Sequence, residues 1–223
     1  MTTTLCCRQR RRPRVWFLLI LILTACQSPT PQASPLPAPA SPVMTDAFSP
    51  PNAAWARFDT DASAVYAQEG ELYLEDRGEG TSVYTPLLGQ PHRDVTIAVQ
   101  MRYVEGTMNN WMGVICRLQD EENYYLLAIS ADGYYLIMRV QDGAATPLTG
   151  PLAGETIHTG KAENTMEARC RGNTLSLRVN DVLLVTRSDN ALDSPGDVAL
   201  FADAVDHGQT TTVAFDDFVL SAP

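Results

Sequence analysis

Hydrophobic and polar residues alternate with a period of two along the centre of the chain. Such alternation is typical of strands that lie half-buried in a β-sheet. The pair Asp132-Gly133 interrupts it, and this pair is a strong hairpin signal because glycine adopts positive φ without steric cost. The pattern therefore predicts three consecutive antiparallel strands over Trp111–Leu118, Asn123–Ser130 and Tyr134–Val140.

The same alternation recurs along the remainder of the chain after residue 60, and no segment there keeps an apolar period of 3.6 residues. Many short strands between turn signals are typical of an all-β sandwich or barrel. The further strands that we expect are Ala64–Gln68, Glu71–Glu75, Ser82–Thr85, Val95–Val104, Thr165–Arg171, Thr174–Asn180, Val182–Thr186, Val198–Asp203 and Thr211–Ser221.

Each expected strand has two unlike faces, because successive side chains point to opposite sides of a sheet. Between Val95 and Val104 one face is apolar, whereas the other carries Thr96, Gln100 and Arg102. A sheet with one core face and one polar face packs against a second sheet of the same kind. The pattern therefore predicts an all-β fold of two antiparallel sheets packed as a sandwich.

The N-terminal segment has the composition of an export signal. Residues 1–14 contain five arginines and no acidic residue, and Val15–Ala25 is apolar apart from Thr24. A basic region followed by a short apolar run and small residues predicts a secretory signal peptide, since a bilayer span needs about 20 apolar residues. The sequence Leu-Thr-Ala-Cys resembles the lipobox of bacterial lipoproteins, which implies cleavage before Cys26 and acylation of Cys26. An uncleaved signal anchor or a plain secreted protein is the alternative.

Three segments are therefore expected: a lipoprotein signal peptide over residues 1–25, a disordered linker over 26–45 and one domain over 46–223. Eight of the fifteen prolines fall between Gln27 and Asn52, with serine and alanine between them. Such a composition favours extended conformations and cannot bury a core. The acyl chains on Cys26 would hold the domain at a membrane of the cell envelope, on its extracytoplasmic side.

The charge of the exported chain is strongly negative. Removing five of the sixteen Lys and Arg residues leaves eleven against 26 acidic residues, a formal charge of −15. An acidic surface argues against nucleic acid as a partner and against direct binding of anionic lipid.

Two cysteines remain for the domain, because Cys6 and Cys7 leave with the signal and Cys26 takes the lipid. Cys116 and Cys170 both lie on apolar faces of expected strands. An even pair in an oxidising compartment indicates a disulfide, and two buried free thiols are the alternative.

Several stretches together resemble the concanavalin A-like lectin and glucanase sandwich domains of bacterial surface proteins, whose relatives include laminin G-like modules and the domain called 3-keto-disaccharide hydrolase. They are G-V-I-C-R, N-Y-Y-L-L-A-I-S-A-D-G-Y-Y, the Cys-x-Gly-Asn-x-Leu-x-Leu-x-Val-Asn run, G-D-V-A-L and the closing V-A-F-D-D-F-V. The resemblance covers Asp46 to Ser221. It implies a jelly roll of two curved antiparallel sheets, often with a groove on the concave one.

The chain departs from the glycosidases of that fold at their catalytic motif. These enzymes carry Glu-x-Asp-x-Glu on one strand, because alternation then aims carboxylates about 5 Å apart at one bond. The chain has no such run, and it has no other catalytic motif that we recognise. We therefore name no catalytic residue.

Aromatic and arginine side chains of the central strands are the candidates for ligand binding. Sugars offer C–H faces to aromatic rings and hydroxyl groups to planar guanidinium groups. The alternative is that these aromatic residues pack in the core and the arginines are solvated or ion-paired. The candidates are Trp111, Arg117, Tyr125, Tyr135 and Arg139, with Tyr124 and Tyr134 beside them.

A structural calcium ion is the one cofactor that we consider. Jelly rolls of the resembling kind often bind calcium where the first and last strands meet, and calcium takes six to eight oxygen ligands. The candidate ligands are Asp46 and Asp216. Turn and edge-strand aspartates with no metal are the alternative.

The leading hypothesis is a lipid-anchored extracytoplasmic sandwich that binds a carbohydrate or another cell-envelope polymer without transforming it. The first alternative is a glycoside hydrolase-like enzyme of the 3-keto-disaccharide hydrolase type. The second alternative is a protein-binding module of an envelope complex. Since one fold hosts all three functions, only the residues and geometry of the site can distinguish between them.

Overall fold

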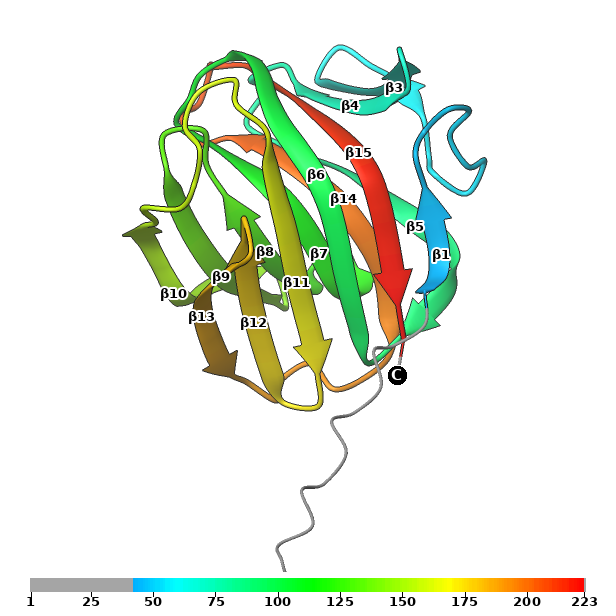
Figure 1. The fold of residues 1–223 in the computed structure, drawn as a ribbon, viewed down its shortest axis with the longest axis vertical. Helices are drawn as coiled ribbons and strands as arrows, with labels where there is room; N and C mark the ends of the chain where they lie inside the picture. Colours follow the sequence, from blue (N-terminus) through cyan, green and yellow to red (C-terminus); the bar gives the residue numbers. More distant parts are fainter. Residues whose placement is uncertain (1–41, 223) are drawn as a thin grey trace, which may run out of the picture. The chain divides into compact units, whose positions relative to one another are not determined.

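The computed structural model describes residues 42–222, and every regular element in that range is a β-strand (Figure 1). All the predicted strands are confirmed, although several ends are displaced. The largest displacement is at β5 (Val83–His92), which continues well past the predicted end at Thr85. The all-β prediction is therefore confirmed.

The strands form two antiparallel sheets, one of nine strands and one of six. The nine-stranded sheet has the order β13-β12-β11-β6-β15-β4-β3-β2, and β1 also pairs with β15. Its strands are β1 (Pro42–Asp46), β2 (Phe58–Asp59), β3 (Ser63–Gln68), β4 (Glu71–Asp76), β6 (Val95–Gly106), β11 (Asn164–Arg171), β12 (Thr174–Val179), β13 (Val182–Ser188) and β15 (Thr211–Ser221).

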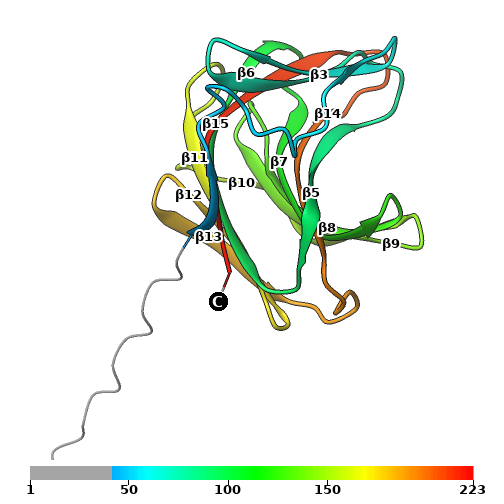
Figure 2. The ribbon, with the colours of Figure 1, turned by 90° about the vertical axis from the view of Figure 1, so that its right-hand side faces the viewer.

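The six-stranded sheet has the order β10-β9-β8-β7-β14-β5. In Figure 2, β11, β12 and β15 of the larger sheet lie on the left, and β5, β8 and β9 of the smaller sheet lie on the right. The predicted two-sheet sandwich is thus confirmed. Besides β5, the strands of this sheet are β7 (Asn110–Asp120), β8 (Asn123–Ile129), β9 (Tyr134–Gln141), β10 (Ala144–Ala153) and β14 (Gly196–Ala204).

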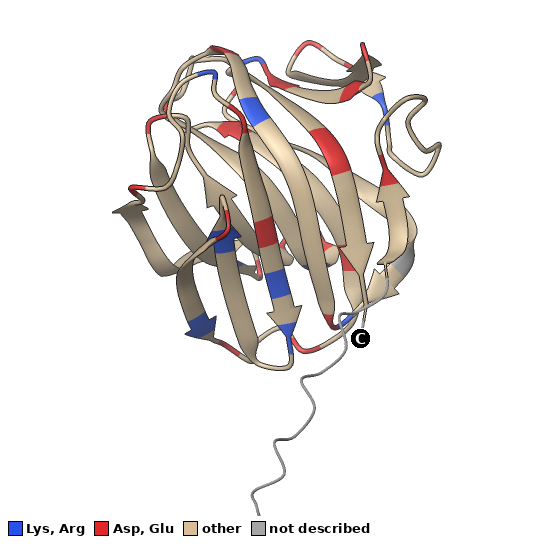
Figure 3. Ribbon diagram, in the orientation of Figure 1, with Lys and Arg blue, Asp and Glu red and all other residues tan. Residues whose placement is uncertain are grey.

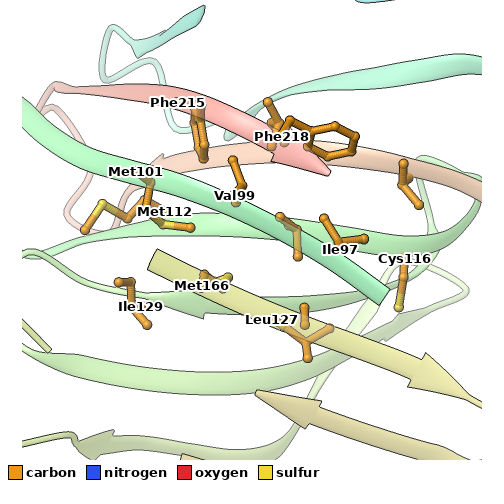
Figure 4. Packing of buried hydrophobic residues seen from close by; sticks show 14 of the residues in the cluster. Ile97, Val99, Met101, Met112, Cys116, Leu127, Ile129, Met166, Phe215 and Phe218 are labelled. Atoms are coloured by element: carbon orange, nitrogen blue, oxygen red, sulfur yellow. The ribbon is translucent and has the colours of Figure 1, made fainter. Parts of the chain in front are cut away.

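The main core lies between the two sheets, as the alternation requires. On β6 every second residue from Val95 to Tyr103 is buried, and the residues between them are more exposed. The inward side chains of β7 and β8 face them, and Figure 4 shows the two sets packed together. Fully burying one such aliphatic or aromatic side chain stabilises a fold by about 1.5–3 kcal/mol.

A disulfide between Cys116 of β7 and Cys170 of β11 joins the two sheets, which confirms the predicted bridge. The two Cα atoms are 6.7 Å apart, within the range that a disulfide spans. Both cysteines belong to the main core cluster.

Three strands were not predicted. Strand β1 begins at Pro42, so the fold includes four residues of the segment expected to be linker. The two-residue strand β2 is too short to show alternation. Strand β10 contains Pro147, Gly150 and Pro151, which resemble a turn, but it pairs only with β9 at the sheet edge and has irregular register there. Proline is tolerated on such edges.

The predicted signal peptide, most of the linker and the lipid site Cys26 lie outside the described residues. Among residues 42–222 there is no helix long and apolar enough to cross a membrane.

Candidate functional site

The outer face of the six-stranded sheet, which points away from the main core, carries a second apolar cluster. Its centre is as buried as the core itself: Ile115, Leu126 and Ala128 are 0% exposed. The larger side chains of Tyr84, Trp111, Tyr124 and Met138 pack around this centre and are partly exposed. The cluster therefore has a buried floor and an aromatic border, and we call it the outer apolar face.

The strand register explains why the centre of the outer apolar face lies below its border. Phe201 of β14 pairs with Gly113 of β7, and Gly113 pairs with Ala128 of β8. Ala128 in turn pairs with Leu136 of β9. The two smallest residues of this row thus sit between two large ones. A side chain at position 113 would overlap the Leu127 carbonyl, so the glycine is required by the backbone.

One end of the outer apolar face opens into a cavity of about 520 Å³, which we call the Trp111 cavity. Its size falls within the range of sites for small ligands, which are mostly apolar with a few placed polar groups. The cavity has that composition. It is lined by Asn109, Trp111, Ser130, Asp132, Tyr134, Leu136, Pro151 and Val205.

The turn between β8 and β9 shapes one wall of the cavity. Gly133 has φ of 98°, as the predicted hairpin requires. The Ser130 hydroxyl donates to a carboxylate oxygen of Asp132 and accepts a hydrogen bond of 2.9 Å from the Tyr134 amide. The Ala131 amide donates to Asn110 Oδ1 over 2.9 Å, which fixes this turn to the start of β7. The polar wall is therefore held in place before any ligand binds.

Asp203 of β14 lies directly opposite Trp111 of β7, on the same face of the sheet. Directly opposed residues of an antiparallel pair have Cβ atoms about 4.5–5.5 Å apart. Burial, followed by the negative charge of Asp76, raises the pKa of Asp203 to about 6. Below that pH the Asp203 carboxyl is neutral and can donate a hydrogen bond beside Trp111.

The predicted binding residues separate into different environments. Trp111 lines the cavity together with Tyr134, which is 42% exposed. Tyr124 belongs to the border of the outer apolar face. Tyr135 lies on the opposite face of β9 and packs against the main core. The structure thus brings Trp111 and Tyr134 together and leaves Tyr135 outside this site.

Arg117 does not fit the binding role predicted for it, because its side chain is 0% exposed. Its Nε donates to the Arg93 carbonyl over 2.8 Å, Nη1 to the Leu192 carbonyl over 2.8 Å, and Nη2 to the Gly172 carbonyl over 2.6 Å. Nη2 also lies 3.4 Å from Asp94. The guanidinium group therefore joins three loops at one end of the sandwich, which is a structural role.

Tyr125 and Arg139 are held by one carboxylate, Asp189. The Tyr125 ring is fully buried, its hydroxyl donates to Asp189 over 2.5 Å, and it accepts from the Leu192 amide over 3.1 Å. Burial and the hydrogen bond to Asp189 raise the pKa of Tyr125 to about 12. Arg139 forms an ion pair of 2.7 Å with Asp189. The Tyr125 prediction is not supported, since no ligand can reach a fully buried ring.

The residues around Asp46 do not fit the predicted calcium site. Asp46 Oδ1 accepts from the Phe48 amide over 2.8 Å, and Oδ2 accepts from the Asn52 amide and the Trp55 indole over 2.8 and 2.9 Å. Both oxygens thus face N–H donors. Asp216 instead accepts from the neighbouring Asp217 amide. Within residues 42–222, no group of three or more acidic, histidine or cysteine side chains is arranged to hold a metal.

Sequence reasoning missed Asn109, Ser130, Asp132, Val205 and Asp203 as parts of the site. The first four lie in or beside turns that meet only after the sheet has formed. Asp203 carried one available signal, because it is the single polar residue of the strand predicted over Val198–Asp203.

Comparison with solved structures identifies the fold. The chain is similar to the carbohydrate-binding module CBM66 from Bacillus subtilis at 15% identity and a TM-score of 0.50, covering 75% of this chain and 91% of that one. It is similar to a Bacillus licheniformis β-glucanase at 11% identity and a TM-score of 0.55, covering 81% and 98%.

It is also similar to the catalytic domain of an endo-1,3-β-glucanase from Thermotoga petrophila RKU-1, at 9% identity and a TM-score of 0.59, covering 82% and 98%. No protein-family model matches the chain, and no curated protein sequence matches it. At these identities the likeness concerns the fold alone: a concanavalin A-like jelly-roll sandwich.

Proposed function

We propose that the protein is a carbohydrate-binding module of the cell envelope, which takes a glycan into the Trp111 cavity. The observation that supports this proposal most is the pairing of Trp111 and Tyr134 with Asn109, Ser130 and Asp132 around one cavity. A sugar needs both kinds of contact, because its C–H faces pack on aromatic rings and its hydroxyl groups form hydrogen bonds. The likeness to a carbohydrate-binding module and to glucanases agrees with this assignment.

The outer apolar face gives a longer glycan a surface to follow beyond the cavity. Tyr84, Trp111, Tyr124 and Met138 border it and remain partly exposed. Rigid aromatic side chains supply contact area at little conformational cost. We propose that consecutive sugar units extend from the Trp111 cavity along this border.

The N-terminal segment supports a location at the membrane. Acylation of Cys26 would anchor the chain, and the proline-rich residues after it would act as a spacer. In this proposal the module holds a glycan or a cell-envelope polymer close to the outer side of a membrane.

A panel of soluble polysaccharides and peptidoglycan fragments tests the proposal, with binding measured by calorimetry. Trp111→Ala should raise Kd about 30-fold, equivalent to about 2 kcal/mol, as truncation of a central tryptophan does elsewhere. Phe58→Ala is the matched control, because Phe58 is an exposed aromatic residue on β2 of the other sheet. Equal losses in both variants, or binding to no member of the panel, would reject the proposal.

One observation favours hydrolysis as a second candidate function. A carboxyl with a pKa of about 6, as Asp203 has, can act as a general acid near neutral pH. The same samples should therefore be assayed for released reducing sugar. Release that is lost in Asp203→Asn while binding persists would establish the enzyme, whereas binding without release supports the module.

A further inference from the structure

Positive charge gathers on the outer face of the nine-stranded sheet, on the opposite side of the sandwich from the Trp111 cavity. Residues 42–222 contain eleven Lys and Arg residues against 26 acidic residues. Three of the eleven, Arg169, Arg171 and Arg178, lie on this face of the neighbouring strands β11 and β12. Figure 3 shows Lys and Arg segments on both of these strands. A cluster of this kind is unexpected on so acidic a chain.

The register places three of the arginines in adjacent rows of one sheet face. Arg169 and Arg171 alternate on β11, and Arg178 of β12 pairs across to Glu167. Arg169 pairs with Ser176, and Arg171 pairs with Thr174. The three guanidinium groups therefore project from one surface with hydroxyl side chains between them. We call this surface the arginine face.

The arginine face is short of negative charge. Glu167 is the single carboxylate among its lining residues, and it serves both Arg169 at 3.1 Å and Arg178 at 3.7 Å. The guanidinium group of Arg171 has no ion pair or hydrogen-bond partner among the residues that the structure describes. The face thus keeps a net charge of about +2 on a domain whose formal charge is −15.

Two arginines outside the arginine face form ion pairs with carboxylates. Arg102 contacts Glu71 at 2.5 Å, and Arg77 contacts Asp59 and Glu75 at 2.8 and 2.9 Å. Each of them has at least one carboxylate of its own. The arginine face is different, because Arg169 and Arg178 share the single carboxylate of Glu167 and are still 51% and 40% exposed.

A hollow of about 270 Å³ lies between these side chains. Thr174, Ser176 and Thr186 contribute hydroxyl groups to its lining. Guanidinium groups bind carboxylates, sulfates and phosphates through paired hydrogen bonds, and they do so better than ammonium groups. The hollow is therefore suited to an anionic group that carries neighbouring hydroxyl groups, as an acidic sugar does.

We propose that the arginine face is a second binding site, which takes the anionic sugar units of an acidic polysaccharide. A hollow of this size accommodates one or two charged units. Among residues 42–222, no aromatic side chain lines the hollow, so it offers no surface on which the bases of a single-stranded nucleic acid could stack. The site is independent of the Trp111 cavity, so either assignment can fail without the other.

The test compares polygalacturonate, dextran sulfate, uncharged dextran and single-stranded DNA as probes of the full chain, with binding measured by calorimetry at 50 and 500 mM salt. Both acidic polysaccharides present the anion that the site requires, one as a carboxylate and the other as a sulfate. We expect one or both acidic polysaccharides to bind. High salt should weaken their binding at least about 5-fold by screening. Any binding of uncharged dextran should be the same in the wild type and in every arginine variant.

Arg171→Gln is the decisive variant, because it removes a charge whose guanidinium group has no ion pair or hydrogen bond among the residues that the structure describes. It should weaken acidic binding at least about 5-fold, as loss of a paired guanidinium contact does. Arg57→Gln is the matched control, since Arg57 is also exposed and lies outside the arginine face. Unchanged melting temperatures exclude a folding effect.

The proposal fails if neither acidic polysaccharide binds, if both variants lose affinity equally, or if single-stranded DNA binds as tightly as the polysaccharides. Trp111→Ala should leave acidic binding unchanged. If it removes acidic binding while Arg171→Gln does not, the ligand lies in the Trp111 cavity and the arginine face is rejected.

Discussion

Replacing Arg117 by methionine should destabilise the protein strongly and leave glycan binding intact. Arg117 is fully buried and donates to carbonyl oxygens in three separate loops, at residues 93, 172 and 192. Methionine fills a similar length of the core but supplies no donor. The substitution therefore leaves three carbonyl groups and Asp94 without their common partner.

The size of the effect follows from these contacts. Each buried acceptor left unpaired costs about 1–3 kcal/mol, although water can reach the more open carbonyls. Breaking a buried charged network by removing one member costs about 3–5 kcal/mol. We expect a loss of about 3–4 kcal/mol in the free energy of unfolding. For a domain of this length that lowers the melting temperature by roughly 10 °C.

Urea denaturation of Arg117→Met and wild type, followed by tryptophan fluorescence, measures this loss. Arg57→Gln controls for loss of an exposed charge and should stay within about 0.5 kcal/mol of wild type. Glycan titrations at a temperature where Arg117→Met is folded complete the comparison. A variant as stable as wild type that no longer binds glycan would contradict the structural role and restore Arg117 as a ligand-binding residue.

Three further predictions concern stability. Reducing the disulfide between Cys116 and Cys170, 54 residues apart, should cost about 4 kcal/mol in the chain-entropy account, measured by urea denaturation with and without reductant. Because the pKa of Asp203 is raised to about 6 in the fold, stability should fall as pH rises from about 4 to 6. Asp203→Asn should therefore stabilise the protein by about 1–3 kcal/mol at pH 8 and by almost nothing at pH 3.5, and an equal gain at both pH values would refute this. A chelator should leave the melting temperature unchanged, because both oxygens of Asp46 accept N–H donors, and a drop would support the calcium prediction.

Most strand positions could be predicted from alternation, and the disulfide from alternation together with the even pair of cysteines expected in an exported domain. Cys116 and Cys170 both lie on the inward side of their strands, and the structure joins them there. Strand β10 could not be predicted in the same way, because Pro147 and Pro151 are typical of turns. Proline is tolerated in a strand at a sheet edge, and the sequence does not show that β10 lies at one.

Alternation gives the wrong side for Arg117, and the backbone shows why. It predicts that Arg117 shares the outer face with Trp111 and Ile115. In the structure Arg117 has φ of 52°, and the pairing of β7 with β8 is irregular after Cys116. A bulge of this kind re-aims a side chain, here from the outer face into the interior. The bulge at Arg117 therefore explains why this arginine has a structural role and not the ligand-binding role that alternation predicts.

The Trp111 cavity could be predicted only in part. Trp111 and Tyr134 were candidates from their chemistry, but Asn109, Asp132 and Val205 reach the cavity from different turns. Strand order determines which turns meet at one end of a sheet. Local sequence patterns do not predict strand order. The same limit applies to the arginine face, since Arg178 joins Arg169 only through the pairing of β11 with β12.

The most direct measurement is the response of the tryptophan indole signals in a proton–nitrogen correlation NMR spectrum during titration with a bound glycan. Trp111 lines the cavity, whereas Trp55 is 2% exposed and donates to Asp46, so the chain contains its own control. The third tryptophan, Trp16, lies in the expected signal peptide, so the chain from Cys26 carries two indoles, and Trp111→Phe assigns their signals. The account predicts that the Trp111 signal shifts with ligand concentration while the Trp55 signal stays in place. Glycan binding that leaves the Trp111 signal unmoved would contradict it.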